Sequence, residues 1–197
     1  MYTQSIGTPL VDYYNVTAAV YFQDDIRLKR GLTLSPGIRY SVQNNVSDRT
    51  AFEPRFGLTW APFAGGTTTL RGSVGLFHGW LPPGLIEQTL RMDGVSQKEI
   101  LVLNPSYPNP NLESGLLPPS NRYLIGDEFH LQRNLRYSAG IDQVLTPRVR
   151  MNLLYNYIHL QQQPRGRNLN APVNGVRPDP NFANVIESIT DTEIRRH

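Results

Sequence analysis

The chain has 197 residues, enough for one domain with a sizeable core, and its lack of cysteine excludes a disulfide framework and a thiolate metal site. The formal net charge of +3 comes from scattered basic residues, so nucleic acid is not an expected partner. Charged residues make up only 18%, while Gly and Pro number 16 each, which is typical of many short strands joined by turns and long loops.

No apolar run approaches the roughly 20 residues that a membrane helix needs, and the mean hydropathy is −0.38. These values do not exclude a membrane β-barrel, in which only alternate strand residues meet lipid. The N-terminus, Met1–Gly7, lacks the basic and apolar regions of a signal peptide. For an exported protein this indicates processing or truncation, and we expect truncation.

Alternation of apolar and polar residues with a period of two predicts antiparallel strands along most of the chain, whereas helical periodicity is almost absent. In chain order the predicted strands cover residues 14–28, 32–42, 52–62, 68–80, 135–145, 149–158 and 185–193. Asp24 is the one exception in the first run. Pro36 and Pro54 lie inside strands, where each removes a ladder hydrogen bond, so we expect bulges near them.

The connections between the predicted strands alternate in length. Short turns are expected at residues 29–31, 63–67 and 146–148, and long links at 43–51, 81–132 and 161–184. Outer-membrane barrels alternate in this way, with short periplasmic turns and long outer loops. Folding each short turn also continues the apolar face from one strand to the next, which pairs Leu28 with Leu32, Pro62 with Thr68, and Leu145 with Val149.

Six stretches, in this order, resemble the barrel of TonB-dependent transporters, particularly the Oar-type group with a carboxypeptidase-regulatory-like extension. They are Tyr21–Arg27, Leu32–Tyr40, Phe52–Phe63, Thr69–Phe77, Tyr137–Asp142 and Arg167–Pro172. The resemblance implies a bacterial outer-membrane barrel of about 22 strands around a plug domain, energised by the inner-membrane TonB complex. Its partners would be outer-membrane lipid, the plug of the intact protein and TonB.

About seven predicted strands are too few for such a barrel. We therefore expect residues 1–197 to be a fragment of one all-β domain, a partial antiparallel up-and-down meander with long outer loops and without plug or signal peptide. One face of each strand should meet lipid and the other the lumen. The expected lipid-facing residues, on the convex side, include Ile38, Tyr40, Phe56, Leu58 and Trp60.

Aromatic residues gather near strand ends, as in the two interfacial girdles of a membrane barrel. Toward the long links lie Tyr13, Tyr14, Tyr40, Trp80, Tyr155 and Tyr157, and at a short turn lie Trp60 and Phe63. A soluble β-core is the alternative interpretation of the same pattern.

The polar face carries the predicted lumenal charges Arg39, Glu53, Arg55 and Arg71. A hairpin centred near Ser47 would place Arg39 opposite Arg55, with Glu53 between their guanidinium groups. Two like charges across a ladder are unfavourable, so Glu53 should offset their repulsion.

No catalytic, metal or cofactor site is expected. The histidines at 78, 130, 159 and 197 lack metal-ligand spacing. Asp24 and Asp25 are strand neighbours that should point to opposite faces, so they cannot share a proton. Gly72, Gly75 and Gly79 do not predict a phosphate loop, because no helix is expected after Pro82–Pro83.

The long link 81–132 is expected to lack regular structure, and links of that kind are commonly functional. In the family that the chain resembles, outer loops capture ligand, so Trp80, Tyr107 and Tyr123 are candidate ligand contacts. The leading hypothesis is a wall segment of an active importer of unidentified ligand. A non-transporting structural or adhesive barrel and a soluble carbohydrate-binding module are the alternatives, and an enzyme is the least supported class.

Overall fold

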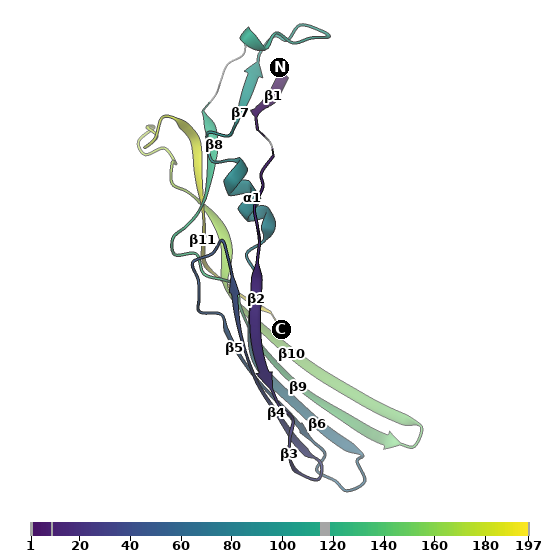
Figure 1. Cartoon of the computed structure of the whole chain (residues 1–197). Coiled ribbons are helices and arrows are strands. Elements are labelled where there is room, and N and C mark those ends of the chain that lie inside the picture. Colours follow the sequence, from purple (N-terminus) through teal and green to yellow (C-terminus); the bar gives the residue numbers. More distant parts are fainter. Residues whose placement is uncertain (1, 9, 115–118, 197) are drawn as a thin grey trace. The chain divides into compact units, whose positions relative to one another are not determined.

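The computed structural model describes residues 2–8, 10–114 and 119–196. The chain divides into two compact units, which we call the sheet unit and the loop unit (Figure 1). The sheet unit comprises residues 16–80, 130–164 and 190–197, and the loop unit comprises residues 1–15, 81–129 and 165–189. No helix in the described ranges is long and apolar enough to cross a membrane.

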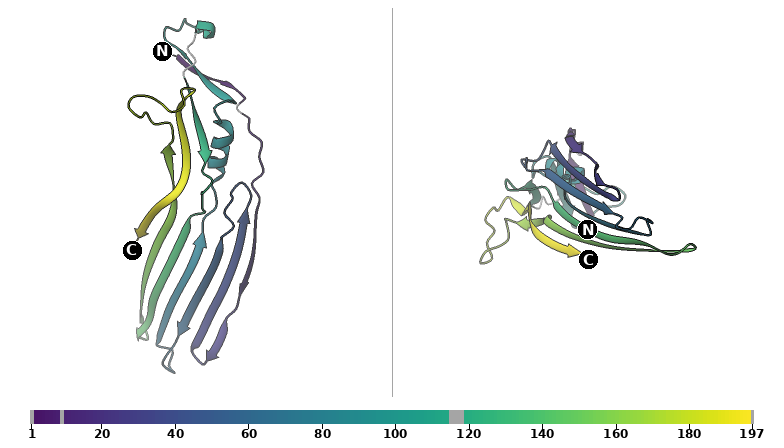
Figure 2. Two further views of the ribbon diagram at one scale, coloured as in Figure 1. Left: turned by 90° about the vertical axis from the view of Figure 1, so that its left-hand side faces the viewer. Right: turned by 90° about the horizontal axis from the view of Figure 1, so that it is seen from below.

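The sheet unit is an antiparallel meander whose strands lie side by side (Figure 2). Its strands are β2 (Thr17–Gln23), β3 (Ile26–Lys29), β4 (Leu32–Gln43), β5 (Phe52–Trp60), β6 (Thr68–His78), β9 (Arg133–Thr146) and β10 (Val149–Asn168). They are ordered β2-β4-β5-β6-β9-β10, and β3 also pairs with β4. This arrangement confirms the predicted strand order and the three short turns.

The break between β2 and β3 falls at Asp24, where the predicted alternation also failed. The carbonyl of Pro36 accepts the Asp24 N–H at 3.1 Å. In an antiparallel sheet, the backbone N and C=O of one residue point to the same neighbouring strand. The ring nitrogen of Pro36, which has no hydrogen to donate, therefore faces the break between β2 and β3. The β4–β5 register continues without a shift from Leu32–Trp60 to Tyr40–Phe52. The bulges expected near Pro36 and Pro54 are therefore absent from this pair.

At the second short turn the strand register agrees with the prediction, because Trp60 pairs with Leu70 and the same register places 62 opposite 68. At the other two turns the pair beside the turn differs from the prediction by one residue. Lys29, rather than Leu28, lies opposite Leu32, and Thr146, rather than Leu145, lies opposite Val149. Each difference comes from a register shift beside the turn, beyond which the predicted register holds. In the long 43–51 link the prediction was wrong by two residues, because Arg39 pairs with Glu53 and not with Arg55. A long link does not fix register, and a shift of two preserves the faces.

The loop unit corrects the prediction that residues 81–132 lack regular structure. It contains β1 (Tyr2–Gly7), α1 (Pro83–Arg91), β7 (Gln97–Val102), the short 3-10 helix η1 (Leu112–Ser114), β8 (Ser120–Ile125) and the start of β11 (Phe182–Arg196). β1 pairs antiparallel with β7, and β8 pairs parallel with β11, an exception to the predicted antiparallel meander.

Helix α1 begins at the position that we expected to break a helix. Pro83 occupies the first turn, where its missing N–H would have no intrahelical partner anyway. After the helix, the Asp93 carboxylate accepts the N–H groups of Val95 and Ser96, each at 2.7 Å. Gly94 then adopts φ +88°, and the Phe182 ring lies so close that a Cβ would be 2.3 Å from it. Short-range capping and one close ring contact therefore order this segment.

Candidate functional site

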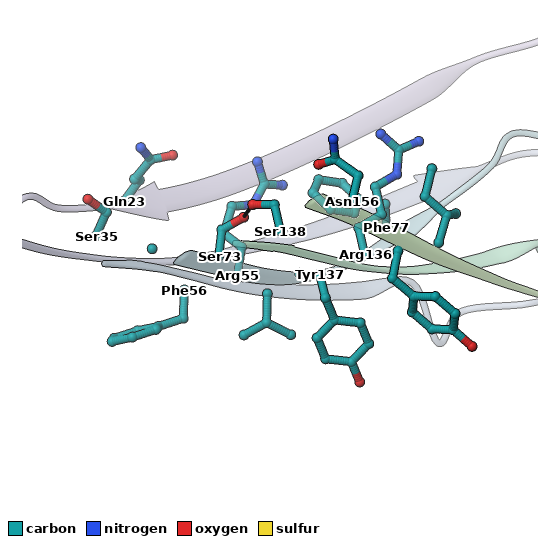
Figure 3. Close-up of a pocket in the computed structure, with 15 residues that line it drawn as sticks. Gln23, Ser35, Arg55, Phe56, Ser73, Phe77, Arg136, Tyr137, Ser138 and Asn156 are labelled. Carbon is teal, nitrogen blue, oxygen red and sulfur yellow. Dashed lines mark hydrogen bonds between the residues drawn. The ribbon is translucent and has the colours of Figure 1, made fainter. Parts of the chain in front are cut away.

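The two faces of the sheet unit differ in polarity, and the apolar face is exposed. Its exposed large residues are Val20, Phe22, Ile38, Phe52, Phe56, Trp60, Val74, Tyr137, Met151, Leu153 and Tyr155. On the other face, Ser41, Gln43 and Glu53 are buried. Figure 3 shows Phe56 and Tyr137 on one side of the sheet, and Ser73 and Ser138 on the other. A water-soluble sheet buries its apolar face, whereas a membrane barrel presents it to lipid.

Aromatic side chains pack in pairs on the apolar face. The rings of Tyr40 and Phe52 lie 4.5 Å apart, and those of Tyr137 and Tyr157 lie 6.0 Å apart. The Tyr40 hydroxyl donates to the carbonyl of Arg49 at 3.3 Å, in the link that follows β4. An apolar ring with its polar tip beside a loop is the arrangement expected at a membrane interface.

Glu53 lies at the centre of a charge cluster on the polar face. Its Oε2 is 3.8 Å from Arg39 Nε and 3.4 Å from an Arg55 guanidinium nitrogen. Its Oε1 accepts the backbone N–H of His78 at 3.0 Å. The Glu53 side chain is only 7% exposed. The carboxylate therefore contacts both arginines as expected, although the register that brings it there differs from the predicted one.

Arg71, the fourth predicted lumenal charge, belongs to a separate group. It forms an ion pair with Asp142, whose other oxygen accepts a hydrogen bond from the Asn152 amide. In the sheet, Arg71 lies between Thr59 on β5 and Gly140 on β9. The structure thus joins Arg39, Glu53 and Arg55 but pairs Arg71 elsewhere.

A hollow of about 520 Å³ lies beside the Glu53 cluster and is lined by residues of β2, β4, β5, β6, β9 and β10 (Figure 3). The residues that form its basic and aromatic side are Arg55, Phe77 and Arg136. The guanidinium carbons of the two arginines lie 5.2 and 5.1 Å from the centre of the Phe77 ring. The small residues Ser73 and Ser138 also line it, and their hydroxyl oxygens are 2.6 Å apart.

Sequence reasoning did not single out Phe77 or Arg136. Phe77 carried a usable signal, because it is an apolar residue at a polar-face position of β6, where Arg71, Ser73 and Gly75 precede it. Arg136 lies far away in the sequence. Only the β6–β9 register, which places Gly75 opposite Arg136, brings the two arginines to either side of one ring.

Asp48, in the link between β4 and β5, forms a second polar centre that sequence reasoning missed. Its Oδ1 accepts the N–H of Thr50 at 2.8 Å and the Thr50 hydroxyl at 2.6 Å. Its Oδ2 accepts the N–H of Leu131 at 2.8 Å and lies 3.6 Å from His130 Nδ1. Burial raises the pKa of Asp48, but the bonds from Thr50 and Leu131 and the nearby His130 outweigh it, so the pKa lies below 3.8.

The three candidate loop aromatics lie in different surroundings. Tyr107 is 97% exposed, whereas Trp80, just beyond β6, is about half-exposed. Tyr123 lies within β8 and pairs with Ile186 of β11, so it belongs to a strand and not to an open loop.

The histidines and the aspartate pair are the remaining polar groups considered from the sequence. The described residues contain no group of three or more His, Cys, Asp or Glu side chains that could hold a metal ion. His197 lies outside the described residues. Asp24 accepts the N–H of Asp25 at 2.8 Å, and Asp25 accepts the Ser35 hydroxyl at 2.5 Å. Each carboxylate therefore has its own donor.

Comparisons with solved structures show the same fold. Over 92% of its length, the chain is similar to the outer-membrane transporter YddB from Escherichia coli, with a TM-score of 0.67 and 17% identity. Over the same share it is similar to a mutant ferric enterobactin receptor, PfeA, from Pseudomonas aeruginosa in complex with enterobactin, with a TM-score of 0.59 and 14% identity. The chain covers 20% of the first and 23% of the second. A comparison with curated proteins gave no match.

The family comparison covers the N-terminal part of the chain. The model described as "TonB dependent receptor-like, beta-barrel" matches residues 2–116, more than half of the sequence. The exposed apolar face and the antiparallel meander agree with that match. The chain therefore belongs to the TonB-dependent receptor β-barrel family, and it is a protein of the bacterial outer membrane.

Proposed function

We propose that the chain forms part of the wall of an outer-membrane transporter that takes up a ligand actively. The observation that carries this proposal is the exposed apolar face of the sheet unit, backed by a polar face with Glu53 at its centre. Such a wall separates lipid from a polar interior. Family membership supports the direction of this inference, because its members are named for their dependence on TonB.

The proposal includes two partners that are not present in the structure. A plug domain of the intact protein would lie against the polar face, where Arg39, Glu53, Arg55 and Arg71 supply charges. TonB would supply energy from the inner membrane. The chain spans about a fifth of the length of the solved structures that it matches, so these partners belong to the proposed whole protein.

Ligand contact is proposed for the aromatic residues of the long links. Tyr107 is the strongest of the three candidates, because its nearly complete exposure leaves its ring free to stack on a ligand. Trp80 remains a candidate at the end of β6. Tyr123 is the weakest, since its backbone is held in β8, where its N–H donates to the Met92 carbonyl at 2.9 Å.

The test is whether uptake depends on both this protein and TonB. The full-length protein is produced in cells with and without TonB, and growth is measured on a panel of single nutrients and iron sources. We expect at least one source to support growth only when both proteins are present. Growth that persists without TonB would indicate a passive pore. No protein-dependent growth on any source would indicate a structural barrel.

A further inference from the structure

The arrangement of Arg55, Phe77 and Arg136 depends on the absence of a side chain at Gly75. In the ladder, Gly75 lies between Arg55 on β5 and Arg136 on β9. The Phe77 ring folds back over it, so closely that a Cβ at Gly75 would be 2.8 Å from Phe77 Cε2. The ring thereby lies between two guanidinium groups and holds each by a cation–π contact.

Positive charge around this ring exceeds negative charge. Arg39, Arg55 and Arg136 carry three positive charges, whereas Glu53, with one negative charge, is the carboxylate that pairs with the first two. Arg136 has no ion pair with a carboxylate among the described residues, and its guanidinium lies over the Phe77 ring. A cation–π contact uses the flat face of a guanidinium and leaves the N–H groups at its edge able to bind an anion.

The surroundings provide room and further donors for such an anion. The hollow of about 520 Å³ is within the range of small-molecule sites, roughly 300–1,000 Å³. Ser73, Ser138 and Asn156 add two hydroxyl groups and one amide beside the arginines. Figure 3 shows these side chains on the same side of the sheet as Arg55 and Arg136.

We propose that Arg55 and Arg136, held by Phe77, form a binding site for a carboxylate or phosphate group of the transported ligand. This inference rests on the proposed function, because it treats the polar face of the sheet as the path of the ligand. It adds the chemical class of that ligand, an organic anion. The guanidinium N–H groups bind the anionic group, whichever of the two serine hydroxyls does not donate to the other donates to it, and Phe77 acts as a positioning residue.

Binding is measured directly, without energised transport. Purified full-length protein in detergent is titrated calorimetrically at low salt with citrate in one arm and inorganic phosphate in the other. We expect at least one of the two to bind. We expect Arg136→Gln to weaken that binding by about tenfold to a hundredfold, since a charge-assisted hydrogen bond is lost. Phe77→Leu should weaken it less, because it frees both guanidinium groups but keeps their charge.

Arg150→Gln is the matched control. Arg150 lies on the polar face of the sheet, as Arg136 does, but on β10 near the short turn, where it pairs with Val144. Its substitution removes the same charge without changing a residue that lines the hollow. Its effect should stay within about twofold. Equal weakening by Arg150→Gln and Arg136→Gln would show a general charge effect and overturn the proposal, as would no binding of either anion. Absence of binding together with a lower melting temperature in Arg136→Gln would also overturn the proposal, and would indicate that an acidic side chain of the plug occupies the site instead.

The binding and growth experiments fail independently. Anion binding that is lost in Arg136→Gln, combined with growth that does not need TonB, would retain the site and contradict active transport. TonB-dependent growth without anion binding would support active transport and contradict the anion site.

Discussion

Leu58 and Thr59 are neighbours in β5 whose side chains point to opposite faces. Leu58 lies on the apolar face with Leu34 and Gly72 as its partners in the ladder, and Thr59 lies on the polar face opposite Thr33 and Arg71. An arginine at the lipid-facing midplane of a barrel costs roughly 2–4 kcal/mol. Placing an arginine at position 58 or at position 59 therefore tests which face of the sheet meets lipid.

We expect Leu58→Arg to impair assembly of the full-length barrel and Thr59→Arg, its matched control, to be much milder. Assembly is followed by the shift in electrophoretic mobility between heated and unheated outer-membrane fractions. Equal effects of the two substitutions would show that the lipid and lumen faces are wrongly assigned.

Gly75 and Gly72, both on β6, test whether the Phe77 ring lies as close to the strand as the structure shows. A Cβ at Gly75 would meet the Phe77 ring at 2.8 Å, whereas a Cβ at Gly72 would meet the Ser138 carbonyl oxygen at an ordinary 3.8 Å. Gly75→Ala should therefore displace the ring and lose its two cation–π contacts, each worth about 0.5–1 kcal/mol at an exposed site. Gly72→Ala should change the free energy of unfolding much less, as measured by denaturant unfolding in detergent. Similar losses in both variants would argue against the close approach of Phe77.

At the scale of elements, the β4–β5 link is joined to the segment before β9 by Asp48. The Leu131 N–H that bonds to Asp48 comes from that segment, and the Arg133 guanidinium that donates to the Thr50 hydroxyl at 3.1 Å comes from the first residue of β9. Contacts between such distant parts of the chain hold a link that has no regular structure of its own. The Asp48 carboxylate itself accepts three hydrogen bonds, from the Thr50 N–H, the Thr50 hydroxyl and the Leu131 N–H, and these favour its charged form.

We expect Asp48→Asn to destabilise the protein by about 1–3 kcal/mol at neutral pH, because an amide nitrogen would face a donor. The folded-state pKa lies below 3.8, so this contribution is complete above the unfolded pKa and is lost as the pH falls through the folded one. The difference in melting temperature between wild type and Asp48→Asn should shrink as the pH falls below about pH 4. Asp127→Asn, at an exposed position, serves as control, and a difference that grows as the pH falls below about pH 4 would contradict the assignment.

At the scale of the whole molecule, the sheet should separate lipid from a water-filled interior. Tyr155 and Asn156 are adjacent in β10, with Tyr155 on the exposed apolar face and Asn156 beside the hollow. In a cysteine-free background, we expect Asn156→Cys to react faster with a water-soluble maleimide and Tyr155→Cys with a bilayer-soluble one. The rates are measured in outer-membrane vesicles, and a reversed order would place the lumen on the other side.

The sequence by itself determined the all-β class, the order of the sheet strands and the two faces. These features are local, since the pleat fixes alternation along each strand and a tight turn such as 146–148 fixes the register of its neighbours. Local patterning was insufficient in the loop unit, where α1 starts at a proline and β8 depends on pairing with β11.

The tertiary structure alone decided which side chains meet. The alternation of residues on either side of the 43–51 link is compatible with any β4–β5 register that differs by two residues. Only the folded hairpin shows that Glu53 lies opposite Arg39. Arg136 joins Arg55 around Phe77 because β9 pairs with β6 after a long excursion of the chain. Contacts of this kind depend on chain closure over many residues, and alternation within a strand carries no information about them.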